Sequence, residues 1–277
     1  FPASASFNYL FKAWTNNVTD VIRNNDTAYK LVKLIENDPV TSLPLTETFE
    51  SMPVGEFTVP EMAIGNNQRI DFSTNTVRGR ARTYVNTGFA HNGMKAMTLD
   101  QTPYNENITT DSLIVNYNLS AQTTNQLRYD FYYKNHGQIN DPSNKIWIRG
   151  SETNEWVQAY DLFANQAATG MWKHGVININ DELNKAVPPQ TLTATFQIKI
   201  GQAGKTSANS PLPENDIDDG YTFDDMTLKQ AINDVAVTKI NSPSTAECSL
   251  SATEKISIKI KNFNPITLNG LQANYQI

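Results

Sequence analysis

The sequence predicts an all-β protein, and three observations support this class. Apolar and polar residues alternate with a period of two in residues 7–14, 127–133 and 193–200, which is typical of half-buried strands. The connecting stretches, such as residues 65–68 and 209–216, are rich in Asn, Ser, Gly and Pro, the residues of turns and loops. Long helical periodicity is nearly absent. We therefore expect antiparallel sheets along the whole chain.

Two segments mark boundaries within the chain. The first spans residues 36–44, where Pro39 and Pro44 disfavour strand pairing, and the second spans residues 229–233, which follow a clear strand. They divide the chain into three parts, residues 1–40, 41–229 and 230–277. The middle part suits a two-sheet sandwich of the jelly-roll kind, whereas each flank is too short for an independent β-domain.

One short helix is expected in the middle part. Residues 180–186 follow a strand-like stretch and carry Asp181 and Glu182 where the first helical turn would lie. Acidic side chains stabilise that end of a helix, and Asn is a preferred residue at the N-cap. The pattern predicts a helix that begins at Asn180.

Composition and charge exclude several classes of protein. The chain has 277 residues and a formal net charge of -6, with its Lys and Arg residues scattered along it. Nucleic-acid binding is therefore not expected, because a phosphate backbone requires a clustered basic face. No window approaches the roughly 18 consecutive apolar residues that a membrane span needs.

The cysteine content and the chain ends say little about the cellular compartment. Cys248 is the single cysteine and cannot form an intrachain disulfide, so the sequence carries no redox evidence. The chain begins at Phe1 without a Met and ends at Ile277 within an alternating run. We expect it to be part of a longer protein, with any signal peptide or sorting tail outside it.

Four stretches of the middle part resemble a known kind of module. They are residues 46–51 (TETFES), 91–100 (HNGMKAMTLD), 196–200 (FQIKI) and 219–226 (DGYTFDDM). Together they resemble a MAM-like or cleaved-adhesin-like jelly roll, a concanavalin A-like β-sandwich of large secreted and surface proteins of Bacteroidetes-type bacteria. The resemblance implies a secreted or cell-surface location.

The two flanks resemble complementary halves of one repeat. Residues 233–237, 248–254 and 258–263 resemble the opening half of a CARDB-like immunoglobulin-fold repeat, and residues 7–14 with 20–27 resemble its closing half. An unpaired sheet edge is a template for further strands. We therefore expect the halves to pair, either head to tail between molecules or within one chain.

Motif searches argue against the common enzyme classes. The chain has no G-x-S-x-G elbow, no H-E-x-x-H zinc helix, no G-x-x-x-x-G-K-[ST] phosphate loop and no G-x-G-x-x-G fingerprint. His91, His136 and His174 are far apart in sequence, and Cys248 stands among small polar residues. We interpret the histidines as loop or surface residues and the cysteine as a packed small hydrophobe.

Paired carboxylates suitable for a glycosidase are also missing from the strand patterns. Such enzymes need an acid and a base roughly 5–10 Å apart across a cleft. Glu152 and Glu155 lie just before Trp156 in what the sequence indicates is a hairpin turn. Solvated turn charges are the interpretation we favour over a catalytic pair.

The best chemical signal is a structural calcium site. Ca²⁺ takes six to eight oxygen ligands, so acids that converge from distant strands suit it. The resemblance implies structural ligands at Glu50, expected to end the first jelly-roll strand, and at Asp224, in the last strand; Asp225 and Asp100 could join them, together with loop carbonyls. Alternatively, Asp224 and Asp225 only cap a strand end and Glu50 faces water.

A competing calcium arrangement resembles an EF-hand loop. Glu214, Asp216, Asp218 and Asp225 fall at positions one, three, five and twelve of such a loop. However, Asp219 stands where the loop needs Gly, and Asp225 replaces the bidentate Glu. These departures favour a solvated acidic loop.

Aromatic residues supply the second functional signal. A platform that stacks sugar rings could be formed by Trp147, Trp156, Trp172 and Tyr160. Alternation places Trp147 on one face of its strand and Ile146 and Ile148 on the other face, and one of these two faces must be core. The alternation does not say which face that is, so core packing is the alternative for each Trp.

These observations favour a non-catalytic extracellular module of a large surface or secreted protein, stabilised by calcium, that serves in adhesion, binding or spacing. Its partners would be a glycan or a protein of a host or cell surface. The alternative is a carbohydrate-binding module of a secreted glycosidase or peptidase, whose catalytic domain lies elsewhere. An enzyme within this chain is the third hypothesis, because a fold never determines function alone.

Overall fold

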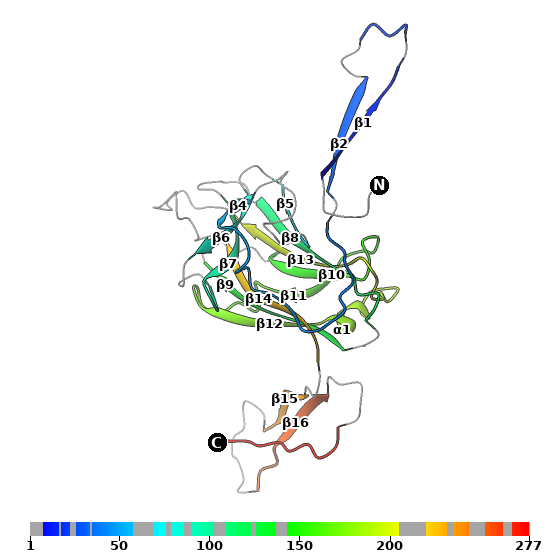
Figure 1. Ribbon diagram of the computed structural model, residues 1–277. Coiled ribbons are helices and arrows are strands. Elements are labelled where there is room, and N and C mark those ends of the chain that lie inside the picture. The colour runs from blue at the N-terminus through cyan, green and yellow to red at the C-terminus, as the bar shows by residue number, and fades with distance from the viewer. Residues whose placement is uncertain are drawn as a thin grey trace.

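The computed structural model confirms the all-β class (Figure 1). It describes residues 8–16, 18–22, 26–33, 35–57, 69–75, 79–85, 90–101, 109–122, 126–136, 143–204, 220–231, 235–243, 253–262 and 268–276. Within these ranges lie sixteen strands and one short helix. No helix of the described ranges is long and apolar enough to cross a membrane.

The first large sheet has five antiparallel strands. Their spatial order is β11 (Val157–Asp161), β10 (Lys145–Arg149), β13 (Phe196–Gly204), β8 (Thr109–Tyr117) and β5 (Ile70–Thr74). Residues 127–133 and 193–200 were expected to form strands, and strands are found at β9 (Leu127–Asn135) and β13. The predicted strands are therefore found in both sheets.

The second sheet has seven strands and closes the sandwich. Its order is β12 (Trp172–Asn178), β9, β14 (Tyr221–Gln230), β7 (Lys95–Gln101), β6 (Gly79–Val85) and β4 (Gly55–Phe57), while β3 (Leu45–Glu47) pairs with β14 off this path. The first and last strands of this jelly roll are thus neighbours, with Met226 opposite Glu47. This pairing brings the region after β3 close to the middle of β14.

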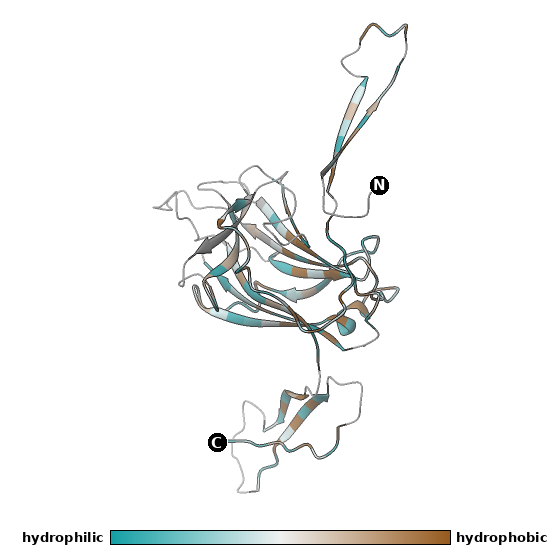
Figure 2. Cartoon of the chain, viewed as in Figure 1, coloured by the Kyte–Doolittle hydropathy of each residue, from teal (hydrophilic) through white to brown (hydrophobic). Residues whose placement is uncertain are grey.

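The core lies between the two sheets and is rich in aromatic side chains. Strand β9 contributes Tyr129, Phe131 and Tyr133, and β14 contributes Tyr221 and Phe223, all of them fully buried. The opposing sheet supplies the aliphatic residues Ile146, Ile148, Leu113, Val115, Ile198 and Ile200. Figure 2 shows the corresponding alternation of hydrophobic and hydrophilic residues along the strands. This core determines which face of each strand is left for solvent or ligand.

The helix α1 (Ile179–Leu183) begins earlier than predicted. Asn178, the last residue of β12, occupies the N-cap, so the prediction of Asn180 as the N-cap is wrong. The physical reason is that Ile179 and Leu183 are buried, which sets the helix directly against the strand end. The Asn180 side chain instead accepts a hydrogen bond from the Leu127 amide at 3.0 Å. The acidic first turn, Asp181 and Glu182, is confirmed.

The segments at both boundaries contact the sandwich. Val40 is buried, and its amide donates to the Asn118 carbonyl at 2.9 Å, while Pro39 forms an isolated bridge to Asn118. At the other end β14 continues to Gln230, and the amide of the buried Ala231 donates to the Gln126 carbonyl. Residues on the outer side of each expected boundary therefore also contact the sandwich.

Each flank contains one antiparallel hairpin outside the two large sheets (Figure 1). The first pairs β1 (Asn8–Trp14) with β2 (Thr27–Lys33), and the second pairs β15 (Val235–Ser242) with β16 (Ser257–Asn262). Both leave large apolar side chains in solvent, including Leu10, Trp14, Tyr29, Val237 and Ile240. Whether they are halves of immunoglobulin-like repeats stays a prediction.

Candidate ligand-binding face

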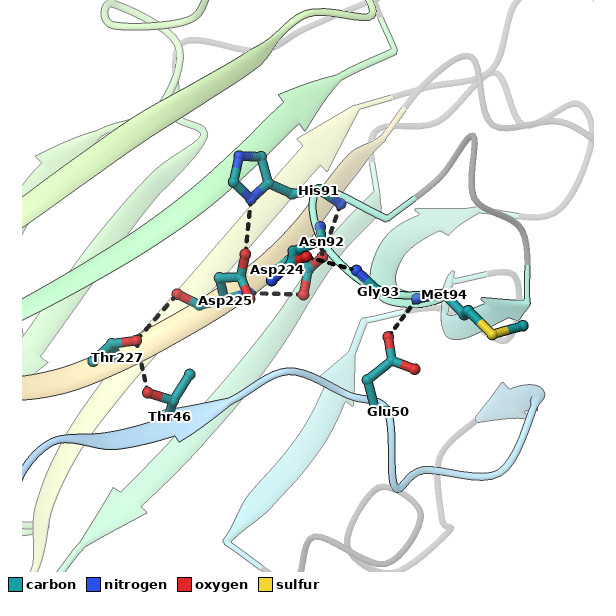
Figure 3. Close-up of polar contacts among 9 residues, drawn as sticks. All are labelled: Thr46, Glu50, His91, Asn92, Gly93, Met94, Asp224, Asp225 and Thr227. Atoms are coloured by element: carbon teal, nitrogen blue, oxygen red, sulfur yellow. Dashed lines mark hydrogen bonds and ion pairs between the residues drawn. The ribbon is translucent and has the colours of Figure 1, made fainter.

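Glu50, the first predicted calcium ligand, holds the loop that leads into β7 (Figure 3). It lies in the turn after β3, because that strand ends at Glu47. Its Oε1 accepts hydrogen bonds from the amides of Met94 and Lys95, both at 2.7 Å. Gly93, at φ 73°, makes this approach feasible, since a Cβ there would lie 2.4 Å from Glu50 Oε1.

Asp224 holds the other end of the same loop. Its side chain is fully buried, and its Oδ2 accepts the amides of His91 at 2.8 Å and Asn92 at 3.2 Å. Its Oδ1 accepts the Asp225 amide at 2.7 Å. Burial raises the pKa of Asp224 to about 6, outweighing these hydrogen bonds, which favour the charged form.

Asp225 lies at a bulge in β14. The pairing register with β9 shifts between Asp224 and Thr227, and Asp225 has a left-handed φ of 47°. The bulge interrupts the two-residue alternation, so consecutive carboxylates both reach the loop before β7. Asp225 Oδ2 lies 2.7 Å from His91 Nδ1, as Figure 3 shows.

Asp100 is the predicted ligand that lies farthest from the others. It is buried in β7 beside Gly220. In the pairing of β7 with β14, Thr98 lies opposite Thr222, and this register places Asp224 opposite Ala96. Four residues of strand separate the two positions, about 13 Å at 3.3 Å per residue. Asp100 and Asp224 therefore do not converge on one ion.

The calcium site remains a prediction. In the described part of the chain, no group of three or more His, Cys, Asp or Glu side chains is placed to hold a metal ion. The Lys95 ammonium already donates to the carbonyls of Glu50, at 2.8 Å, and Met52. These two carbonyls are therefore already engaged, and calcium at the Glu50 carboxylate would need other carbonyl or water ligands. Of the competing loop, Glu214, Asp216 and Asp218 lie outside the described residues.

The four aromatic residues of the predicted platform lie in three places. Trp147 and Trp156 lie together on the outer face of the five-stranded sheet, because Ile146 and Ile148 occupy the core. Tyr160 points to the core, where its ring meets Phe131 edge-on at 5.2 Å. Trp172 lies on the seven-stranded sheet under the Lys134 ammonium, which is 4.8 Å from its ring centroid. Only two members therefore form a shared surface.

Two cations accompany the indoles of Trp147 and Trp156. The Lys199 ammonium lies 4.6 Å from the Trp147 ring centroid and 4.5 Å from that of Trp156. The Arg149 guanidinium carbon lies 4.2 Å from the Trp156 centroid. Such cation–π contacts require the cation to lie over the aromatic face. We call Trp147, Trp156, Lys199 and Arg149 the indole–cation cluster.

A row of polar side chains continues from this cluster across neighbouring strands. Arg149 Nε donates to Gln197 Oε1 at 2.7 Å, and Gln197 Nε2 donates to Asn116 Oδ1 at 2.5 Å. Asn116 Nδ2 then donates to the Arg69 carbonyl at 3.2 Å. This row fixes the rotamers of amides that face outward from β13 and β8.

The polar row forms the floor of a groove of about 400 Å³. Residues of the segment before β3 form part of its lining together with side chains of the sheet and its turns, namely Ile35, Asn37, Asp71, Ile114, Asn116, Arg149, Glu152, Thr195 and Gln197. Its volume falls within the range of small-ligand sites. Sequence reasoning missed Lys199, Arg149, Gln197 and Asn116. The strand alternation could have placed Lys199 opposite the apolar face of β13, but its closeness to Trp147 depends on strand pairing.

The histidines do not form a nucleophilic site within the described residues. His91 and His174 stack on Tyr132 with ring centroids 3.6 and 4.9 Å away, and His136 Nε2 lies 2.7 Å from Thr222 Oγ1. His174 belongs to strand β12 and is exposed there, so it is a surface residue as expected. Cys248 lies outside the described residues, so its expected packing stays a prediction.

The two glutamates of the β10–β11 turn are exposed, in keeping with the interpretation of solvated charges. Glu152 and Glu155 lie in the connection between Arg149 and Val157. Glu152 borders the groove, whereas Glu155 is not part of its lining.

No protein-family model matches the chain. No curated protein matches it either. Among solved structures, it is similar to the family 30 carbohydrate-binding module of a cellulosomal cellulase of Clostridium thermocellum, with 12% identity, a TM-score of 0.38, and coverage of 69% of this chain and 100% of that chain.

Two further solved structures are similar at the same level. The K3 cleaved adhesin domain of Lys-gingipain from Porphyromonas gingivalis has 12% identity and a TM-score of 0.35, covering 67% of this chain and 97% of that chain. TmCBM61, solved with β-1,4-galactotriose, has 14% identity and a TM-score of 0.36, covering 58% and 88%.

Asp224 should make stability depend on pH. Because its folded-state pKa of about 6 exceeds the ordinary 3.8, the folded protein binds the proton more tightly than the unfolded chain between these values. Its contribution to stability is therefore present below pH 4 and is lost as pH rises through 6. The quantity to follow is the free energy of unfolding of wild type minus that of Asp224→Asn. We expect this difference to fall by as much as roughly 3 kcal/mol from pH 4 to pH 7. Urea unfolding in EDTA measures this difference, and a constant difference would contradict the assignment.

Proposed function

We propose that this chain is a non-catalytic, extracellular glycan-binding module that holds its ligand on the outer face of the five-stranded sheet. The observation that carries the proposal is the pair Trp147 and Trp156 beside a hydrogen-bonded row of side chains and a groove of about 400 Å³. Sugar rings have apolar faces and a rim of hydroxyls. A surface that combines aromatic faces with fixed polar groups matches both properties.

The packing of Trp147 supports a preformed platform. Its six-membered ring lies against Gly201 of the neighbouring strand, where a Cβ would come within 2.6 Å of Trp147 Cζ3. The absence of a side chain at Gly201 lets the indole lie along the sheet surface. A ring held in this way loses little conformational freedom when a ligand stacks on it.

The carboxylates that line the groove add hydrogen-bond acceptors to the surface. Asp71 Oδ1 accepts the amide of Phe72 in its own strand at 2.9 Å, and Glu152 is exposed on the turn after β10. Both can accept hydrogen bonds from sugar hydroxyls. An enzyme would need one of them to act as an acid and the other as a base across the scissile bond.

The flanking hairpins support a place within a larger assembly. We propose that residues 1–40 and 230–277 are the closing and opening halves of immunoglobulin-like repeats around the jelly roll. The support is their exposed apolar side chains, such as Trp14 on one hairpin and Ile240 on the other. Such surfaces are stabilised when further strands cover them.

The glycan proposal is tested with Trp variants. Trp147→Ala and Trp156→Ala should each weaken binding to a glycan identified on an array roughly tenfold or more, since stacked aromatic contacts dominate such sites. Trp14→Ala and Trp172→Ala are matched controls on other surfaces and should bind like wild type. Isothermal titration measures the affinities, and a reducing-end assay should detect no cleavage. Equal affinity in all four variants, or turnover of the glycan, would contradict the proposal.

Calcium stabilisation is tested by chelation. If Glu50 binds calcium, EDTA should lower the melting temperature and calcium should restore it, because an ion that binds only the folded state stabilises it by roughly 3 kcal/mol at a hundredfold excess over Kd. Differential scanning fluorimetry measures the shift, with Glu50→Gln as the variant that should no longer respond. An unchanged melting temperature removes calcium from the proposal.

Pairing of the flanks is tested by light scattering on the whole chain. Intermolecular pairing predicts a mass that rises with concentration, while pairing within one chain predicts a monomer whose two hairpins resist protease. A monomer with both ends cleaved rapidly would overturn the idea that the flanks complete each other.

A further inference from the structure

The charge distribution on the outer face of the five-stranded sheet is uneven. Lys145 pairs with Asp161 at 2.7 Å, and Arg69 pairs with Glu36 at 3.1 Å. By contrast, Lys199 has no carboxylate or hydrogen-bond partner among the described residues, and its ammonium contacts only the two indoles. The cation at the centre of the aromatic surface thus has no counter-ion among the residues that the structure describes.

Arg149 adds a second positive charge beside Lys199. Its guanidinium uses Nε for Gln197 and Nη1 for the Asn154 carbonyl at 3.4 Å, and it forms no ion pair within the described part of the chain. The carboxylates of Glu152 and Glu155 lie on the adjoining turn and raise the pKa of Arg149, although burial lowers it more strongly. The remaining guanidinium donors are available to a ligand.

The setting of Lys199 makes its charge costly in the free protein. Burial lowers the pKa of the Lys199 ammonium, and the positive charge of Arg149 lowers it further. Cation–π contacts offset part of this cost. An anion beside the ammonium would offset the rest of this cost. One negative group would both reduce the repulsion between Lys199 and Arg149 and replace the solvation that burial removes.

We propose that the glycan bound on this face is acidic, with the carboxylate of a uronic acid unit placed between Lys199 and Arg149 and its ring stacked on Trp147 or Trp156. This inference rests on the proposed glycan-binding function and names the substrate class. A guanidinium and an ammonium are the two side chains that recognise carboxylates. The sugar hydroxyls would meet Gln197 and Asn116.

Asp71 does not oppose an anion at this position. It lies on the same row of the sheet as Lys199, since Lys199 pairs with Ile114 and Ile114 pairs with Asp71. Two strand spacings separate them, about 10 Å. A ligand that crosses the strands can therefore place its carboxylate at Lys199 and a hydroxyl at Asp71.

The experiment compares acidic polysaccharides with their own neutral forms. Polygalacturonate, alginate and hyaluronan are each paired with the carboxyl-reduced polymer, and affinity is measured by titration against the full chain. We expect at least one acidic polymer to bind roughly tenfold or more tightly than its reduced form, and only the acidic form to lose affinity when NaCl is raised. Lys199→Met should reduce affinity for the acidic form to that of the reduced form. Lys173→Met, an exposed lysine of β12, is the matched control.

The outcomes separate this inference from the glycan-binding proposal. If neutral polymers bind with a dependence on Trp147 while no acidic form is preferred, the acidic inference is overturned and glycan binding stands. If no polysaccharide of a broad array binds, both fail. The salt dependence is measured on wild type, so a poorly folded Lys199→Met variant does not remove the test.

Discussion

The alternation of side chains across two facing sheets is the constraint on which the rest of this structure depends. In β10, Ile146 and Ile148 are fully buried against the aromatic side chains of the opposing sheet, which forces Trp147 outward. A register slip of one residue would exchange these faces, placing an indole in the core and two isoleucines in solvent. The position of the candidate ligand-binding face is therefore a direct consequence of core packing.

Pairing between strands then turns single outward residues into a surface. Trp147 lies opposite Lys199, and Arg149 lies opposite Gln197, because β10 and β13 pair in antiparallel register. The next strand continues the rows with Ile114 and Asn116. None of these neighbours is close in sequence, so the indole–cation cluster and its polar row exist only when the sheet is formed.

The departure from alternation in β14 serves a different purpose. At the bulge of Asp225, two consecutive carboxylates face the loop before β7. Asp224 and Glu50 accept backbone amides of that loop, and Asp225 contacts the imidazole of His91. Backbone amides near a buried region need such partners. The closure of the jelly roll, with β3 beside β14, brings Glu50 and Asp224 to the two ends of the same loop. Glu50 and Asp224 thus hold a loop through hydrogen bonds. They are the acids that the resemblance implies as calcium ligands.

The sequence by itself determined the all-β class and predicted strands at residues 7–14, 127–133 and 193–200, where the structure has β1, β9 and β13. It indicated that Trp147 faces away from Ile146 and Ile148. It also identified Glu50 and Asp224 as acids of one region, and Trp147 and Trp156 as candidates for a platform. These features are local in the sequence, or rest on the resemblance to known modules.

Only the tertiary structure decided which face of β10 is core, because a period of two defines two faces without saying which one meets the other sheet. It also separated Tyr160 and Trp172 from the platform, set Asp100 apart from Asp224, and moved the N-cap to Asn178. Each of these depends on strand order, register or burial against residues distant in the chain. The placement of Lys199 between two indoles is the clearest case, since its partners lie on two other segments.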